Sequence, residues 1–282
     1  MKKGYLLERL TWPKAKKAFE ETTFVVVPIG STEQHGPALP LGTDFFVPRD
    51  IANRLIEKSN VIVTPTIPFG YAKYHTTFPG TLSLHEDTLR QVLIDLCEDL
   101  LKYGTTHILF IDGHGGNLTA LRQCGIWLRE RCIPSAVAVW WQIAPSIDPS
   151  WQAIGHADWV EVSAVMGIDE TLVDMKKAKL PKNIDLSKKL VTLDPHTAEF
   201  KGGTVGVNLL TADITTTGDL MEIGLTAAKD YTIEPSTGSK EIGERFLQGQ
   251  ADYLAEFIEE FRKVTLPPVS ETGPLAKKKS KK

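Results

Sequence analysis

Residues 24–29 read Phe24-Val25-Val26-Val27-Pro28-Ile29, a short apolar run rich in β-branched side chains. These side chains favour extended backbone, and a run without polar alternation is typical of a strand that is covered on both faces. The run ends in Gly30-Ser31-Thr32, which indicates a turn directly after the strand. This stretch therefore predicts a central strand of a parallel sheet with a loop at its carboxyl end.

Helical and extended patterns alternate after this first strand. The clearest helix lies between His85 and Tyr103, where leucines recur every three or four residues and Gly104 provides a stop. Further helices are expected over Val47–Glu57 and up to about Arg131, and further strands over Val61–Pro65, Thr106–Ile111 and Ser135–Trp141. Because parallel neighbours need a crossover between them, the order predicts an α/β fold: a mostly parallel sheet flanked by helices on both faces.

The pattern weakens beyond Ser163. Asp169–Lys201 is polar and rich in lysine, Lys201–Thr204 and Thr215–Gly218 read as loops, and Ile242–Val264 reads as a closing helix. We expect one domain over residues 1–270, in which 168–217 is an insertion or a segment that contacts substrate or another subunit. Residues 271–282 are expected to form a disordered lysine-rich tail, and no function is assigned to it.

Composition and charge restrict the class of protein. The 282 residues are 42% hydrophobic and 24% charged, which excludes a disordered chain or a fibrous repeat. The net charge is −3 although five of the last six residues are lysines, so no nucleic-acid partner is expected. The three cysteines form no metal-binding or disulfide pattern and read as reduced, mostly buried thiols. No apolar run is long enough for a signal peptide or a membrane span, so a cytoplasmic protein without a membrane partner is expected.

Four side chains that can bind metals follow two of the predicted strands. Glu33, His35 and Asp44 come after the first strand, and His114 follows the strand at 106–111. Ligands of open parallel sheets bind at the carboxyl ends of the strands, where such loops converge. In extended backbone Glu33 and His35 point the same way, and Asp44 is the candidate bridge between two ions. Carboxylate and imidazole ligands suit Zn²⁺, Mn²⁺ or Fe²⁺.

Each of these features has a simpler alternative interpretation. A single Glu-x-His is a weak signal, because most isolated histidines are ordinary surface or core residues. The turn Gly113-His114-Gly115-Gly116 precedes a predicted helix, so it is equally typical of an anion nest for a phosphate.

A third region, Gly155–Glu161, adds two candidates. Five residues separate His156 from Glu161, so we expect His156 on a loop and Glu161 on the helix that follows it. Four tryptophans surround this region: Trp140, Trp141, Trp151 and Trp159. They fit either a hydrophobic lid over a small ring substrate or ordinary core packing, which is the commoner arrangement.

Several motifs in order resemble the creatininase (creatinine amidohydrolase) family. They are Pro28–Pro37, Leu39–Asp44, His75–Thr81, Asp112–Asn117 and His156–Glu161. The resemblance implies a parallel-stranded α/β domain, a homo-oligomer such as a hexamer, and two divalent metal ions. It also implies that Glu33 and His114 bind one ion, His35 binds the other and Asp44 bridges them. His156 matches the family histidine that handles the proton of the leaving group.

One departure from the family pattern affects the second ion. Creatininase proper has a Tyr-Glu pair where this chain has Gly115-Gly116, and that glutamate is a ligand of the second metal. If two ions bind here, Glu161 must supply the missing carboxylate, in addition to its expected place among the catalytic residues. The Gly-Gly form resembles branches that act on formamides, short peptides and other small carbonyl compounds.

The leading hypothesis is a binuclear metal-dependent hydrolase that cleaves the amide or formamide C–N bond of a small, cyclic carbonyl compound. The first alternative is hydrolytic C–C cleavage of a carbocyclic diketone, such as an oxidised inositol of the 3-dehydro-scyllo-inosose type. A second is a phosphate or nucleotide binding protein that uses Gly113–Gly116, and a third is a non-catalytic subunit with a decayed site.

Overall fold

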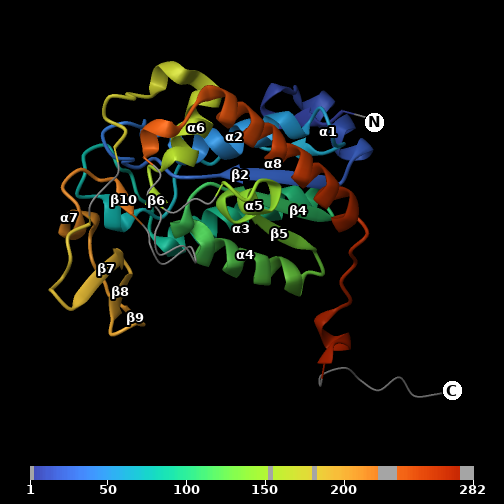
Figure 1. The fold of residues 1–282 in the computed structure, drawn as a ribbon. Helices are drawn as coiled ribbons and strands as arrows, with labels where there is room; N and C mark the ends of the chain where they lie inside the picture. The colour runs from blue at the N-terminus through green and yellow to red at the C-terminus, as the bar shows by residue number, and fades with distance from the viewer. Residues whose placement is uncertain (1–2, 152–154, 180–182, 222–233, 274–282) are drawn as a thin grey trace.

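A computed structural model describes residues 3–151, 155–179, 183–221 and 234–273. Its centre is a sheet of five strands in the order β1-β3-β2-β4-β5, in which every neighbouring pair is parallel (Figure 1). The strands are β1 Tyr5–Leu6, β3 Ile62–Val63, β2 Phe24–Ile29, β4 His107–Asp112 and β5 Ser135–Val139. All six residues of β2 are buried, so the prediction of a central parallel strand is confirmed.

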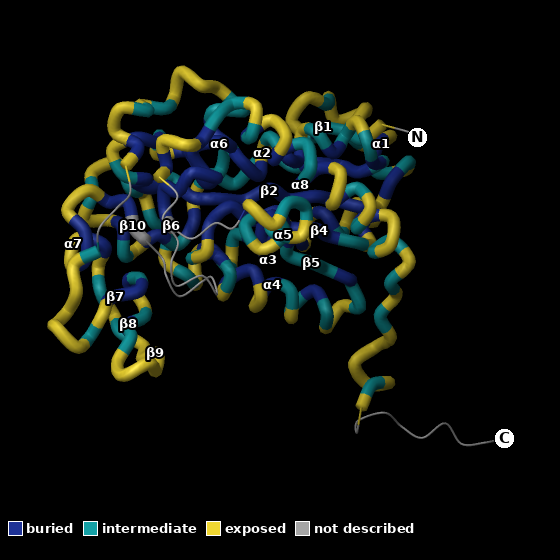
Figure 2. The backbone as a smooth tube through the Cα atoms, viewed as in Figure 1, coloured by how far each residue is buried: buried dark blue, intermediate teal, exposed yellow. Residues whose placement is uncertain are grey.

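Helices cover both faces of this sheet, as predicted. One face carries α2 Thr43–Leu55, α5 Trp140–Ile147, α6 Trp159–Asp169 and α8 Lys240–Phe261. The other carries α1 Trp12–Glu21, α3 Glu86–Lys102 and α4 Leu118–Glu130. Alternate residues of β2 supply the two cores: Phe24 and Val26 pack toward α2 and α8, whereas Val25 and Val27 pack toward α3 and α4. Figure 2 shows the buried residues concentrated along these central layers.

A smaller part of the fold lies at one side of the main sheet. Strands β7 Leu190–Asp194, β8 Thr197–Phe200 and β9 Gly203–Gly206 form an antiparallel sheet, followed by the short helix α7 Thr211–Ile214. Two further short strands, β6 Gly155–His156 and β10 Leu220–Met221, pair with each other. The sheet includes Gly203 and Thr204, so the expected loop at Lys201–Thr204 is wrong there: the loop is a two-residue hairpin turn at Lys201-Gly202.

Two of the element boundaries that differ from the sequence prediction lie near the site. Helix α2 begins at Thr43 rather than Val47, and Pro48 lies inside the helix, where it leaves the carbonyl oxygen of Asp44 without an N–H partner. Asp44 is therefore in the first turn of a helix and not in the preceding loop. Strand β5 ends at Val139, and Trp140 and Trp141 begin helix α5 instead of ending a strand.

The sequence also led to expectations about the cysteines, the C-terminal tail and the domain limits. Cys97 and Cys124 are free and buried and Cys132 is partly buried, as expected of reduced thiols. No helix among the described residues has both the length and the apolar character needed to cross a membrane. Most of the predicted tail, residues 274–282, lies outside the described residues. The domain limits at 1–270 and 168–217 stay predictions.

Candidate metal centre

The register of the sheet brings the predicted ligands together. Ile29 of β2 pairs with Asp112 of β4, so the two strands end side by side and their loops leave from the same edge. All six predicted site residues are buried. They are Glu33, His35, Asp44, His114, His156 and Glu161. The convergence predicted from the ends of the two strands is thus observed, with α6 adding Glu161.

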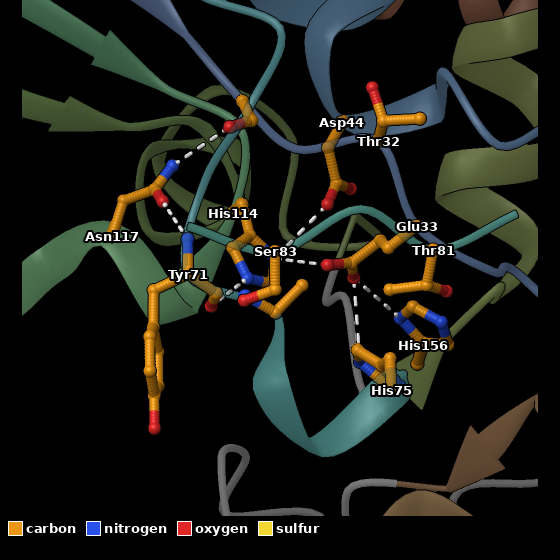
Figure 3. Close-up of polar contacts among 12 residues, drawn as sticks. Thr32, Glu33, Asp44, Tyr71, His75, Thr81, Ser83, His114, Asn117 and His156 are labelled. Atoms are coloured by element: carbon orange, nitrogen blue, oxygen red, sulfur yellow. Dashed lines mark hydrogen bonds and ion pairs between the residues drawn. The ribbon is translucent and has the colours of Figure 1, made fainter. Parts of the chain in front are cut away.

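One group of side chains surrounds His114 (Figure 3). Its Nδ1 lies 3.2 Å from Glu33 Oε2 and 3.0 Å from Asp44 Oδ2. The other ring nitrogen, Nε2, lies 2.9 Å from the carbonyl oxygen of Tyr71, to which it donates a hydrogen bond. Since Nε2 carries a hydrogen, Nδ1 is the atom that can offer a lone pair to a cation beside the two carboxylates.

A second group lies on the other side of Asp44. His35 Nε2 is 2.8 Å from Asp44 Oδ1 and 3.9 Å from Glu161 Oε2. Asp44 therefore presents Oδ2 to one group and Oδ1 to the other. Potential ligand atoms of Glu33, Asp44 and His114 lie within 4.8 Å of one another, as do those of His35, Asp44 and Glu161. A third such set consists of Glu33, His35 and His156.

The hydrogen-bond partners of these groups are incomplete in a way that fits a cation. Glu33 Oε2, His35 Nε2 and Asp44 Oδ2 are buried, and although each lies 2.8–3.2 Å from another atom of the cluster, none of these described contacts has hydrogen-bond geometry. Burial raises the pKa of Glu33 and of Glu161, because a charged carboxylate is costly away from water and Asp44 adds negative charge. Buried carboxylates facing imidazole lone pairs form a donor set that suits a divalent transition-metal ion.

The contact between His35 and Asp44 shifts the pKa of both groups in opposite directions. Burial opposes charge on His35, but the adjacent Asp44 carboxylate dominates and raises the pKa of His35 to about 10. The same pairing outweighs burial at Asp44 and holds the pKa of that carboxyl well below its usual range. A cation that binds between His35 and Asp44 would displace the proton on His35, so metal binding at this pair is expected to release protons.

His156 lies next to this cluster on β6, which is a strand and not the expected loop. Its Nε2 donates a hydrogen bond to the backbone oxygen of Gln34 at 2.5 Å, and its Nδ1 faces Glu33 Oε1 at 3.9 Å. Burial, with the positive charge of His35, lowers the pKa of His156 to about 3. A neutral imidazole with Nδ1 free of hydrogen results, which can accept a proton inside the site.

The turn between His156 and α6 sets the position of Glu161. Ala157 adopts a φ of 65°, and its backbone N–H donates to Glu161 Oε2 at 2.7 Å. Asp158 caps the helix by accepting from the backbone N–H groups of Val160 and Glu161. The expected separation of His156 and Glu161 onto different elements is confirmed.

Comparison with known proteins identifies the fold family. The sequence profile described as creatinine amidohydrolase matches residues 8–258, which is more than half of the chain. The chain belongs to the creatininase family. Among solved structures, a creatinine amidohydrolase from Bacteroides fragilis aligns with a TM-score of 0.71 at 22% identity, over 95% of this chain and 99% of that one. A creatininase variant described as a Zn-Zn type aligns with a TM-score of 0.68 at 22% identity, over 93% and 99%.

Curated relatives carry three different descriptions. The mycofactocin precursor peptide peptidase of Mycolicibacterium smegmatis is 35% identical over 158 residues, 53% of this chain and 60% of that protein. The creatinine amidohydrolase of Pseudomonas putida is 26% identical over 63% of this chain and 76% of its own length. The 3-dehydro-scyllo-inosose hydrolase of Thermotoga maritima is 26% identical over 40% of this chain and 36% of its own. The chain thus spans about three fifths of the first of these relatives.

Close packing accounts for the glycine at residue 116 but not for the one at residue 115. A Cβ atom at Gly116 would lie 2.0 Å from the Tyr71 carbonyl oxygen and 2.5 Å from His114 Nε2, so a side chain cannot fit without moving this backbone. A Cβ atom at Gly115 would meet only Trp141, at 3.8 Å. A glutamate at residue 116, as the family pattern led us to consider, therefore has no room in this arrangement.

Some residues of this creatininase-family site were not among the predicted site residues. His75 is buried, and its Nε2 lies 3.4 Å from Glu33 Oε1. Its Nδ1 lies 3.0 Å from Gln34 Nε2 and 2.7 Å from Thr211 Oγ1. His75 is part of a motif that pointed to the family, so a sequence signal existed, whereas no local pattern marks Thr211, which lies within the 168–217 segment.

The tryptophans near the site are mostly structural. Trp140, Trp151 and Trp159 are buried in the core between the sheet and α8, so the lid interpretation is wrong for these three. Trp140 and Trp151 both pack edge-on against Phe246 of α8. Trp141 is only partly buried and lies beside Gly115.

Gly113 packs closely against the backbone of Asp44 in helix α2. A Cβ atom at Gly113 would lie 1.9 Å from the Asp44 carbonyl oxygen, which Pro48 leaves without its helical N–H partner. We expect Gly113→Ala to lower the free energy of unfolding by about 1–3 kcal/mol, as forced overpacking does. Denaturant unfolding measures this, with Gly203→Ala as control because a Cβ atom there meets only Phe200 O at 3.6 Å. Equal stability of the two variants would contradict the contact.

Proposed function

We propose that the chain is a metal-dependent hydrolase that holds two divalent ions and cleaves a C–N bond next to a carbonyl group. The observation that supports this most is the position of Asp44, whose two oxygens face separate sets of ligand atoms at 3.0 and 2.8 Å. In this proposal Glu33, Asp44 and His114 bind one ion, and His35, Asp44 and Glu161 bind the other. Zinc and manganese are favoured, because creatininase structures are described as a Zn-Zn type and as Mn.

The roles of the side chains follow from their positions. When bound, divalent ions supply Lewis acidity, which polarises a carbonyl and makes a water easier to deprotonate. Asp44 and Glu161 are buried beside His35 and supply negative charge that offsets the positive charge of bound ions. His156 accepts a proton at Nδ1, because Nε2 is already held by Gln34 O, and returns it to the leaving nitrogen. Its Nδ1 faces the cluster, 3.9 Å from Glu33 Oε1, which supports proton transfer at this nitrogen.

The relatives favour C–N over C–C cleavage. Both the peptidase and the creatinine amidohydrolase are named for amide chemistry, and their matches cover 53% and 63% of this chain. The inosose hydrolase covers 40%. A carbonyl compound with an amide bond, either a short peptide or a small cyclic amide, is therefore the proposed substrate class, and ring opening of a carbocyclic diketone is the second candidate.

The phosphate-binding alternative is disfavoured by charge. Glu33 and Asp44 lie within 3.2 Å of His114, so an anion at the Gly113–Gly116 turn would meet two carboxylates. The family resemblance also predicts that the chain assembles as a homo-oligomer such as a hexamer. This stays a prediction.

The Glu161→Ala variant tests the second ion. Wild type purified without chelator is expected to hold two metal ions per chain and the variant about one, because His35 and Asp44 alone leave that ion short of a carboxylate ligand. Elemental analysis per chain measures this. The matched control is Glu170→Ala, because Glu170 is exposed and lies just beyond α6. This variant should keep both ions.

Two results would count against the proposal. If wild type holds no metal, even after addition of Zn²⁺, Mn²⁺ or Fe²⁺, the proposal of a metal-dependent hydrolase is wrong. Two ions in both variants would show that Glu161 is not a ligand, while leaving a binuclear site.

A further inference from the structure

The Asn117 side chain connects three chain segments next to the candidate metal centre. Its Nδ2 donates to Gly30 O and to Asp112 Oδ1, both at 3.1 Å. Its Oδ1 accepts the backbone N–H of Tyr71 at 3.1 Å. Gly30 follows β2, Asp112 ends β4, and Tyr71 belongs to the loop after β3, so one buried amide ties together the ends of three adjacent strands.

The orientation of this amide is fixed by its partners. Rotating it by half a turn would place Oδ1 against two oxygen atoms and Nδ2 against an N–H group, so each of the three hydrogen bonds would be lost. Asp112 Oδ1 also accepts the backbone N–H of His114 at 3.1 Å, which holds the Gly113-His114 backbone to the same cluster. Asn117 thus has no unused donor hydrogen.

The Tyr71 backbone transmits this constraint to His114 (Figure 3). Its N–H is held by Asn117, and its carbonyl oxygen accepts the Nε2 hydrogen of His114 at 2.9 Å. Gly70 permits this approach, because a Cβ atom there would lie 2.3 Å from Asn117 Oδ1. Gly116 permits it from the other side, since a Cβ atom there would lie 2.0 Å from Tyr71 O.

We propose that Asn117 is a positioning residue for His114. By holding the Tyr71 peptide it keeps the Tyr71 carbonyl on His114 Nε2, and this directs Nδ1 toward Glu33 and Asp44. Hydrogen bonds of this kind to the outer nitrogen fix both the ring orientation and the tautomer of metal-binding histidines. The inference rests on the proposed metal site for its consequence, but the contact between Tyr71 and His114 can be measured without metal.

The test compares two variants with different packing. Asn117→Ala removes all three hydrogen bonds and leaves a cavity, whereas Asn117→Leu removes them and fills the volume. The control is Gln250→Ala. Gln250 is another buried amide, on α8, and it donates a hydrogen bond to Trp140 O at 3.0 Å. This control reports what the loss of a buried hydrogen bond does to the fold as a whole.

Two readouts are needed. In metal-free, ¹⁵N-histidine-labelled protein, wild type should show a solvent-protected His114 Nε2–H signal, assigned by its loss in His114→Gln, and both Asn117 variants should lose that protection. In titrations with Zn²⁺, both should bind the ion at the Glu33–Asp44–His114 set about 10–100-fold more weakly than wild type, the range for loss of an outer hydrogen-bond partner. Gln250→Ala should change neither readout.

The outcomes separate this inference from the proposed function. Retained protection of His114 Nε2–H in either folded Asn117 variant would overturn the positioning role. Equal weakening of Zn²⁺ binding by Gln250→Ala would overturn it as well, because a general loss of stability would then suffice. A wild type that binds no ion but shows the expected pattern of protection would refute the metal site and leave the Asn117 contact intact.

Discussion

An Asp44→Asn variant is expected to lose both metal ions and, with them, hydrolytic activity by roughly 10³-fold or more. The carboxylate faces His114 through Oδ2 and His35 through Oδ1, so its replacement by a neutral amide weakens both ligand sets at once. A polarising metal contributes several kcal/mol to stabilising a transition state, and each 1.36 kcal/mol corresponds to a factor of ten in rate. No other residue among the proposed ligands belongs to both Asp44-containing sets.

The measurement pairs metal content per chain with the rate on an amide that wild type hydrolyses. Asp50→Asn is the matched control, because Asp50 lies on the same helix and pairs with Arg54 at its partly exposed surface. The control should retain both ions and full activity. Retention of two ions in Asp44→Asn would show that this residue is not the bridge, and loss of one ion alone would assign it to a single set.

His156→Gln is expected to reduce kcat by about 10²–10⁴-fold while the metal content stays at the wild-type value. That range is typical for removal of a general acid or base. With its pKa lowered to about 3, His156 is neutral near pH 7, so its Nδ1 keeps a lone pair that faces the site. Glutamine keeps a polar side chain near Gln34 O but has no group that can carry a proton through the reaction.

Measuring both the rate and the metal content of His156→Gln distinguishes a proton-transfer role of His156 from a role as metal ligand. His107→Gln provides the control, because His107 lies at the opposite end of β4 and donates from Nε2 to Val264 O at 2.9 Å. If His156→Gln loses an ion, His156 is a ligand within the set that contains Glu33 and His35. If the rate is unchanged, the proton must be transferred by another group.

The parallel sheet was predictable because its central strands are continuous apolar runs in the sequence. The apolar runs at 24–29 and 106–111 carry no polar alternation, which is what burial on both faces requires, and both appear within one residue of their expected limits. Ligands at the carboxyl ends of these strands follow from the same geometry. Helix α2 was less predictable, since it begins at Thr43, before the expected start at Val47, and contains Pro48, a residue type that usually interrupts a helix.

The roles of His75, Asn117 and Thr211 could not be read from local sequence. Thr211 lies 136 positions from His75 along the chain, yet their side-chain atoms are 2.7 Å apart. Asn117 ends one of the motifs that resemble the family, but its contacts with Tyr71 and Gly30 arise only because neighbouring strands bring those residues to it. The expected substrate or oligomer role of residues 168–217 stays a prediction, although this contact places part of the segment against the site.

By itself the sequence determined the layering of the protein and the chemistry of its candidate ligands. Periodicity and β-branched runs define which segments are buried, and residue type alone specifies carboxylate and imidazole donors. Only the tertiary structure decided which oxygen of Asp44 faces which histidine and that Glu161 joins His35. The physical reason is that these distances depend on how α6 packs against α2 and α8, and such packing is set by contacts between side chains far apart in the chain.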